Sequence, residues 1–139
     1  MDSRYNVIVK TLPKDSPRNF EMSAALIIAE YFKSDIVFLR PIPLKSPDLN
    51  IRGEVWELKS PIGKSKNTIA NNFKSARKQS INIVIDLRNC KLDERNAISR
   101  IKFAISKRRR RKGKVLVINK RGKVLDFSND MGYHKINRY

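Results

Sequence analysis

Short runs of apolar, mostly β-branched residues alternate along this chain with longer stretches whose apolar residues recur at helical spacing. The runs at 35–39 and 81–85 have the length and composition of buried strands. The apolar spacing predicts amphipathic helices over 17–33, from 65 or 66 to 79, and over 93–107. Ser16 and Pro17 are typical of a helix start and predict that the first helix begins there.

Three further segments complete the expected order of elements. Residues 5–10 form a β-rich opening, and residues 49–51 and 54–59 predict a hairpin about Arg52-Gly53. A second hairpin is expected over 114–119 and 123–127. The order is αβββαβ followed by a helix and a hairpin. It favours an α/β (α+β) fold in which helices flank a mixed central sheet.

Composition excludes several classes of protein. Of 139 residues, 40% are hydrophobic, so we expect one domain over 1–139, with its motif-bearing core at about 17–90 and a basic extension at 91–139. No apolar run approaches the ~20 residues that span a bilayer, and the N-terminus lacks a signal-peptide pattern. We therefore expect a cytoplasmic chain without membrane contact. One cysteine, Cys90, excludes an internal disulfide, and one histidine, His134, leaves oxygen ligands for any metal.

Positive charge is concentrated beyond residue 58. The 31 Lys and Arg against 13 Asp and Glu give a net charge of +18. Residues 1–58 carry 8 basic and 8 acidic side chains, residues 59–112 carry 17 and 3, and residues 113–139 carry 6 and 2. A basic block of this kind is typical of proteins that bind a phosphate backbone. A solubilising surface or binding to anionic lipid is the alternative.

One constellation of acidic and basic residues indicates chemistry. Asp48 follows Pro47, and Glu57-Leu58-Lys59 lies in the expected partner strand. Because side chains alternate along a strand, Glu57 and Lys59 project together, and pairing can bring Asp48 beside Glu57. Two close carboxylates bind a hard cation such as Mg²⁺. A lysine beside that cation can orient water and offset charge on a phosphate. An ordinary charged strand face is the alternative.

These residues also resemble a known family. Pro47-Asp48 and Glu57-x-Lys59, after a helix that carries Glu21, resemble the PD-(D/E)XK nuclease superfamily. The resemblance covers about 19–89. It is closest to the C-terminal tRNA-nuclease domains of contact-dependent growth inhibition (CdiA) toxins and related phage or mobile-element proteins. The motifs that carry this closer resemblance are Gly53-Glu-Val-Trp-Glu-Leu-Lys-Ser-Pro61, Ser65-x-Asn67-Thr68-Ile69 and Ala76-x-x-Gln79-Ser80.

The resemblance implies a restriction-endonuclease-like core and a role for each motif residue. Asp48 and Glu57 would bind Mg²⁺ or Mn²⁺ together with the backbone carbonyl of Leu58. Lys59 would be the catalytic lysine. Glu21 would hold a second ion or a bound water. Gln79 would be the catalytic glutamine beside the active-site strand. The resemblance also implies a bacterial toxin that cleaves RNA, most of all tRNA, in a target-cell cytoplasm, and an acidic immunity protein as partner.

Several polar and basic residues are candidates for contact with nucleic acid. Thr68, Asn72, Ser75 and Gln79 share one helical face, which looks into the active site or is a solvated face. Lys107 begins a run of six cations, more than a helix C-terminus calls for; a localisation-type or lipid-facing patch is the alternative. The candidates are Ser60, Thr68, Asn72, Arg77, Lys78, Lys107, Arg108, Arg109, Arg110, Arg111 and Lys112.

Aromatic residues give fewer indications. Trp56 alternates with Glu57 in the strand pattern, so we expect it in the core and not stacked on a base. Tyr133, His134 and Tyr139 lie in a polar tail, where base stacking and a loosely ordered terminus are both compatible with the sequence.

The function predicted from the sequence is that of a metal-dependent endonuclease that acts on RNA, with tRNA favoured. Two alternatives stay open. One is a DNA endonuclease of restriction or phage type. The other is a non-catalytic nucleic-acid-binding protein, in which the acidic residues only balance Lys59 and Arg52.

Overall fold

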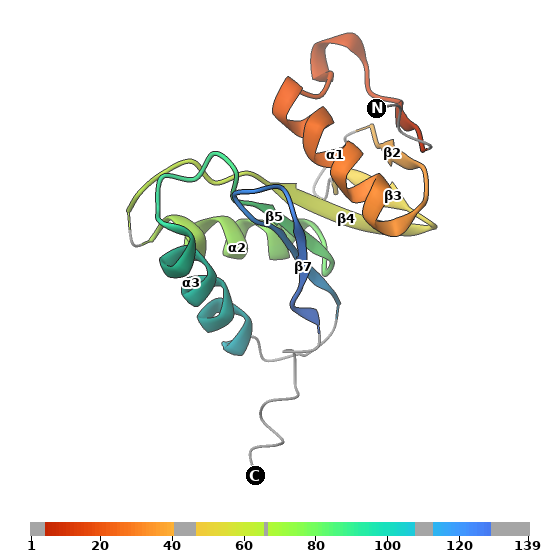
Figure 1. Ribbon diagram of the computed structural model, residues 1–139. Helices are drawn as coiled ribbons and strands as arrows, with labels where there is room; N and C mark the ends of the chain where they lie inside the picture. Colours follow the sequence, from red (N-terminus) through yellow and green to blue (C-terminus); the bar gives the residue numbers. More distant parts are fainter. Residues whose placement is uncertain (1–4, 41–46, 66, 108–112, 129–139) are drawn as a thin grey trace.

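A seven-stranded mixed sheet forms the framework of this protein (Figure 1). The computed structural model describes residues 5–40, 47–65, 67–107 and 113–128. The strands are β1 (Val7–Val9), β2 (Ile36–Phe38), β3 (Leu49–Ile51), β4 (Glu54–Lys59), β5 (Ile83–Asp86), β6 (Val115–Ile118) and β7 (Val124–Asp126). The helices of the described residues are a short 3₁₀ helix, η1 (Pro13–Asp15), and α1 (Asn19–Phe32), α2 (Thr68–Gln79) and α3 (Glu94–Ser106).

The strands lie in chain order across the sheet. β1 runs parallel to β2, and β3 is antiparallel to both β2 and β4. β4, β5 and β6 are parallel, and β7 returns antiparallel to β6. The prediction of a mixed α/β fold is confirmed, with the expected order of elements and one additional strand, β1, in the β-rich opening.

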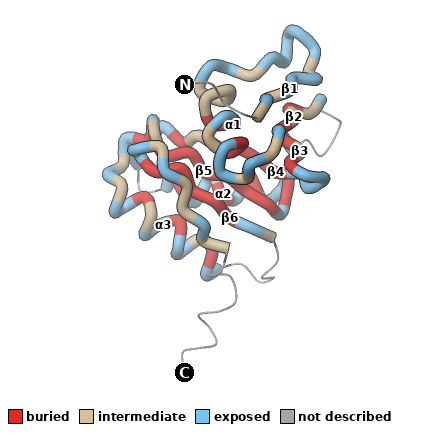
Figure 2. Tube along the Cα trace, turned by 45° about the vertical axis from the view of Figure 1, so that its right-hand side comes forward, coloured by how far each residue is buried: buried red, intermediate tan, exposed pale blue. Residues whose placement is uncertain are grey.

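Helices cover the two faces of the sheet, so its centre is buried on both sides. α1 packs on one face, where its apolar cluster includes Trp56, Leu58 and Val84. α2 and α3 pack on the other face, around Ile83 and Ile85. Figure 2 shows the result as red, buried backbone along the central strands. Trp56 is 1% exposed, which confirms its predicted place in the core.

A tight turn connects β3 to β4. Arg52 and Gly53 both have positive φ angles, 53° and 88°, as the turns of two-residue hairpins require. Arg52 also donates from its guanidinium to the carbonyl of Phe32 at 2.7 Å, which ties the turn to the end of α1. The predicted hairpin is confirmed, and it sets Leu49 opposite Trp56.

The predicted start of the first helix was wrong. α1 begins at Asn19 and not at the Ser16-Pro17 pair. The reason is a cap at the helix start: the backbone N–H of Arg18 donates to the Glu21 carboxylate at 2.8 Å. A carboxylate at this position also suits the positive end of the helix.

The buried strand predicted at 81–85 is displaced along the chain. Ile81 is exposed, and β5 runs from Ile83 to Asp86. Asp86 is a charged residue within a fully buried strand, which is possible because it is ion-paired to Arg88 at 2.9 Å. The second helix likewise begins later than predicted, at Thr68.

The segment predicted as a basic extension contributes to the same sheet. α3, β6 and β7 come from it, and β6 pairs directly with β5. In the described ranges, no helix combines the length and the apolar character that a bilayer-spanning segment needs.

Two glycine substitutions test the backbone geometry at the turns. Gly53→Ala should lower the free energy of unfolding by about 1–2 kcal/mol, the cost of a Cβ at positive φ. The loss should be no larger, because an added Cβ there meets nothing within 4 Å. Gly113→Ala should cost more, because φ is also positive and the new Cβ would clash with the carbonyl oxygen of Ile81. Urea unfolding followed by the fluorescence of Trp56, the single tryptophan, measures both. Equal losses would contradict the close approach at Gly113.

Candidate active site

The hairpin brings Asp48 against β4. Asp48 directly precedes β3, and its backbone carbonyl accepts a hydrogen bond from the N–H of Leu39 at 2.8 Å. Its carboxylate oxygen Oδ2 accepts a second one from the N–H of Leu58 at 3.0 Å. The carboxylate is therefore held by the backbone of the strand that carries Glu57 and Lys59.

Glu57 is the most unusual residue of this cluster because it is a carboxyl group buried in the centre of the sheet. It is 3% exposed. Its oxygen Oε2 lies 3.3 Å from Nζ of Lys59, which confirms that the two side chains project together. Its other oxygen, Oε1, is buried and accepts no hydrogen bond from an N–H or hydroxyl group of the described residues, while the neighbouring Asp48 carboxyl can share a proton with the Glu57 carboxyl. A buried carboxyl oxygen without an N–H or hydroxyl partner costs free energy, which a bound cation or water would offset.

Electrostatics point in the same direction. Burial, followed by the charge of Asp48, raises the pKa of Glu57 to about 8, although Lys59 acts to lower it. Burial also raises the pKa of Asp48; the charge of Glu21 adds to this, while the Leu58 N–H and Lys59 oppose it. The two carboxyl groups resist ionising together, and a cation between them would favour the charged form of both.

The residues present fit a hard divalent cation. In the described ranges, no group of three or more His, Cys, Asp and Glu side chains is placed to hold one ion, so the protein would supply two carboxylates, Asp48 and Glu57. Mg²⁺ typically binds one or two carboxylates and keeps several waters. The ion itself and the carbonyl of Leu58 as a third ligand stay predictions.

Glu21 lies at the edge of this site. It is half-buried in the first turn of α1, and its carboxylate closes the helix cap on Arg18. Its charge contributes to the raised pKa of Asp48, so the two carboxylates interact. The predicted role for Glu21, a second ion or a bound water, stays a prediction.

α2 presents two different flanks beside its buried face. The buried face is Ile69, Phe73 and Ala76, the predicted apolar stripe. The half-buried flank carries Thr68, Asn72, Ser75 and Gln79. α2 contacts both α3 and β4. The roles predicted for Thr68, Asn72 and Gln79 stay predictions.

The remaining predicted contacts are spread over three places. Ser60 directly follows β4, and its Oγ is buried without a partner among the described residues. Arg77 and Lys78 are exposed in the last turn of α2, and Lys107 is exposed at the end of α3. Residues 108–112 lie outside the described residues, as do Tyr133, His134 and Tyr139.

Sequence reasoning missed an ion pair that fixes α1 near the site. The Arg88 guanidinium binds both carboxylate oxygens of Asp86, each at 2.9 Å. It also donates to Oγ of Ser23 at 2.8 Å and to the carbonyl of Phe20 at 3.4 Å, on either side of Glu21. The signal in the sequence was an Asp two residues before an Arg at the end of an apolar run. Its partners on α1 are more than 60 residues away.

The fold and this cluster together define an α/β domain with a nuclease-like core. The sequence model of the contact-dependent growth inhibition CdiA C-terminal domain family matches residues 45–124, more than half of the chain. The chain therefore belongs to this family.

One solved structure extends the comparison. The chain is similar to a chain in the structure described as the CdiA-CT/CdiI toxin and immunity complex from Burkholderia pseudomallei, with a TM-score of 0.55 and 25% identity. The similarity covers 87% of this chain and 97% of that one. A comparison with curated protein sequences gave no match.

The charge of Glu57 should be visible in the stability of the metal-free protein. Its pKa of about 8 in the folded state lies above its ordinary 4.5. Between these values the carboxyl ionises in the unfolded chain and stays protonated in the folded one, so the wild type loses stability as pH rises from about 4.5 to about 8. Glu57→Gln removes this loss. In EDTA, the melting temperature of the variant relative to wild type should therefore rise through this window, by roughly 4 °C for each 1 kcal/mol.

The matched control is Glu54→Gln on the same strand, whose side chain is half exposed and paired with Lys114. Its difference from wild type should stay small, because an exposed ion pair contributes about 0–1 kcal/mol. A difference between Glu57→Gln and wild type that does not change with pH would contradict the assignment. Thermal unfolding by circular dichroism provides the measurement.

Proposed function

We propose that this protein is a metal-dependent endonuclease of the PD-(D/E)XK type that hydrolyses phosphodiester bonds in RNA, with tRNA as its favoured substrate. One observation carries the proposal: the buried Glu57 carboxyl lies against the carboxyl of Asp48 with no N–H or hydroxyl donor on one of its oxygens, while its other oxygen is paired with Lys59. Membership of the CdiA C-terminal domain family supports the assignment to a toxin nuclease.

Asp48 and Glu57 would hold the cation, Mg²⁺ or Mn²⁺. When bound, such a cation neutralises phosphate oxygens and lowers the pKa of a water nucleophile. The N–H of Leu58 keeps the Asp48 carboxylate beside Glu57. Lys59 is partly exposed, so its ammonium is available to a phosphate while its ion pair with Glu57 fixes its position. There it can hydrogen-bond a phosphate oxygen and offset charge that develops during hydrolysis.

The biological setting follows from the family. A chain in a structure described as a toxin and immunity complex is similar to this chain over most of its length. We extend the proposal to a toxin that acts in the cytoplasm of a target cell and is inhibited by an immunity protein. The net charge of +18 favours an acidic partner.

Incubation with total tRNA and with plasmid DNA, each with Mg²⁺, Mn²⁺ or EDTA, tests this function. We expect cleavage of tRNA that depends on the metal and stops in EDTA. Glu57→Gln and Lys59→Ala should each lower the rate at least 10²-fold, because each removes a group that acts on developing charge. Gel analysis of the RNA ends measures it.

Glu54→Gln is again the control and should cleave at the wild-type rate. Cleavage of plasmid alone would indicate the DNA endonuclease, and cleavage that survives in EDTA would contradict the metal. Binding of RNA without cleavage under any condition would indicate the non-catalytic alternative.

A further inference from the structure

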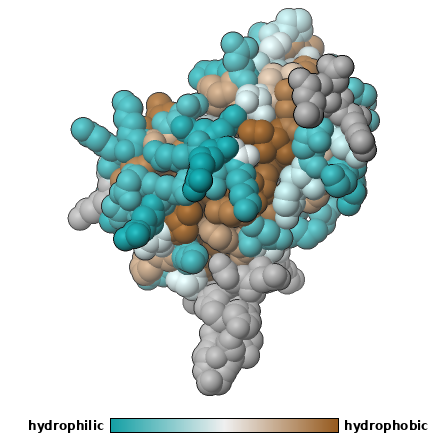
Figure 3. Space-filling view, viewed as in Figure 1, coloured by the Kyte–Doolittle hydropathy of each residue, from teal (hydrophilic) through white to brown (hydrophobic). Residues whose placement is uncertain are grey.

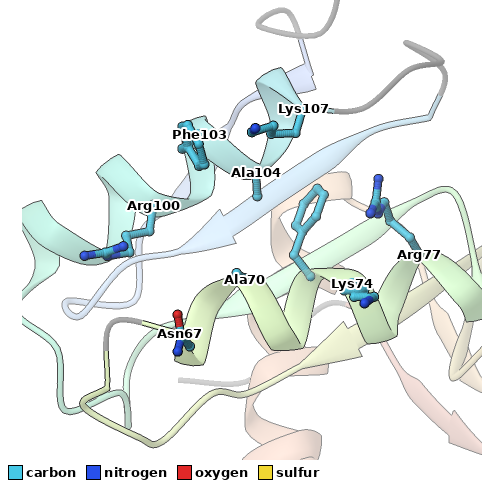
Figure 4. A pocket seen from close by; sticks show the side chains of 9 residues that line it. Asn67, Ala70, Lys74, Arg77, Arg100, Phe103, Ala104 and Lys107 are labelled. Carbon is cyan, nitrogen blue, oxygen red and sulfur yellow. The ribbon is translucent and has the colours of Figure 1, made fainter.

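A groove lies between α2 and α3, and the α2 residues that line it are other than those of the half-buried flank. It has a volume of about 310 Å³, at the lower end of the roughly 300–1,000 Å³ of small-ligand sites. Figure 4 shows Arg100, Phe103 and Lys107 on α3 across from Lys74 and Arg77 on α2. This size suits one nucleotide unit better than an element of a folded protein.

The rim of the groove is strongly positive. Lys74, Arg77, Arg100 and Lys107 line it, and none of the described residues that line it is acidic. Four like charges around one hollow repel one another unless an anion lies among them. In the sequence, Lys107 is followed directly by five further cations. Figure 3 shows hydrophilic side chains gathered over the α3 side of the molecule, with apolar surface between them.

The walls of the groove are apolar and aromatic. Phe103 lines the groove and is 63% exposed. The ammonium of Lys107 lies 5.0 Å from the centroid of its ring, and the guanidinium of Arg77 lies 5.7 Å from that of Phe73. Aromatic rings with adjacent cations are the combination that single-stranded nucleic acids use, because each base has a flat face and each phosphate a charge.

We propose that this groove binds one nucleotide of a single-stranded part of the RNA, with its base stacked on Phe103 and its flanking phosphates held by Arg77, Arg100 and Lys107. This inference rests on the proposed function, because it places a part of the same substrate. The groove and the half-buried flank lie on one helix, α2, whose diameter with side chains is about 10–12 Å. A single RNA strand that crosses α2 can therefore contact both.

The test is a binding titration of the full chain in EDTA with the Glu57→Gln substitution, so that no cleavage occurs. The probe is a short single-stranded RNA that carries 2-aminopurine, a fluorescent base whose emission is quenched by stacking. In this background, Phe103→Ala should weaken binding about 5- to 150-fold, the range expected for one base–aromatic stack, and should remove the quenching. Phe103→Trp should restore both.

Two matched variants control for general effects. Leu26→Ala removes an exposed apolar side chain from α1, on the opposite face of the sheet, and should leave affinity and quenching unchanged. Arg100→Gln should lower the slope of log affinity against log salt by about 0.7. Lys102→Gln, on the side of α3 that contacts Phe127, should lower it less.

Affinity that is unchanged in Phe103→Ala, or that falls equally in Leu26→Ala, would overturn the groove. The assignment would also be wrong if Phe103→Ala weakened the binding of an acidic protein and left RNA binding unchanged. The groove would then be a protein-docking site. The nuclease assay tests the proposed function separately. If RNA binding depended on Phe103 but the chain cleaved no nucleic acid, the nucleotide site in the groove would be supported and the endonuclease function would be contradicted. Cleavage of tRNA by a chain with no Phe103 effect would do the reverse.

Discussion

The pairing of β3 with β4 is the interaction on which the candidate site depends. It sets Leu49 opposite Trp56 and places the Asp48 carboxylate within hydrogen-bond distance of the Leu58 N–H. Because side chains alternate along a strand, a slip of one residue would turn Glu57 to the α1 face. The Arg52-Gly53 turn prevents that slip, and its tie to the end of α1 couples the register to the packing of the helix.

Charge is divided between two places that α2 separates. On one side lie the carboxyl groups of Asp48 and Glu57, and burial raises the pKa of both. On the other side, cations surround an apolar groove beside Phe103. In the proposed function, a phosphodiester chain would bind at the second place and a divalent cation at the first. The alternation of side chains along β4 and the helical period of α2 are sufficient to produce this separation.

The sequence predicted what depends on local periodicity. Alternation separated Glu57 and Lys59 from Trp56, and the apolar spacing identified the buried stripe of α2. It did not predict contacts between distant segments. Arg88 binds Ser23 across 65 positions, and the groove exists only because two helices cross at particular residues. Phe103 lies outside the apolar stripe of α3, so the helical period alone indicated no role for it. Its proposed role depends on Lys74 and Arg77, which line the same groove from α2. Boundaries moved where polar groups found partners, as Glu21 did at the cap of α1.

The pKa of Glu57 tests the central claim most directly, namely that the buried carboxyl group of Glu57 and the half-buried one of Asp48 form a cation site. Carboxyl ¹³C NMR of the full chain can follow it with pH, in EDTA and in saturating Mg²⁺. We predict a pKa of about 8 without metal, because of burial and the charge of Asp48, and a pKa at or below the ordinary 4.5 with Mg²⁺. A pKa near 4.5 in EDTA, or a raised value that Mg²⁺ does not change, would contradict this account.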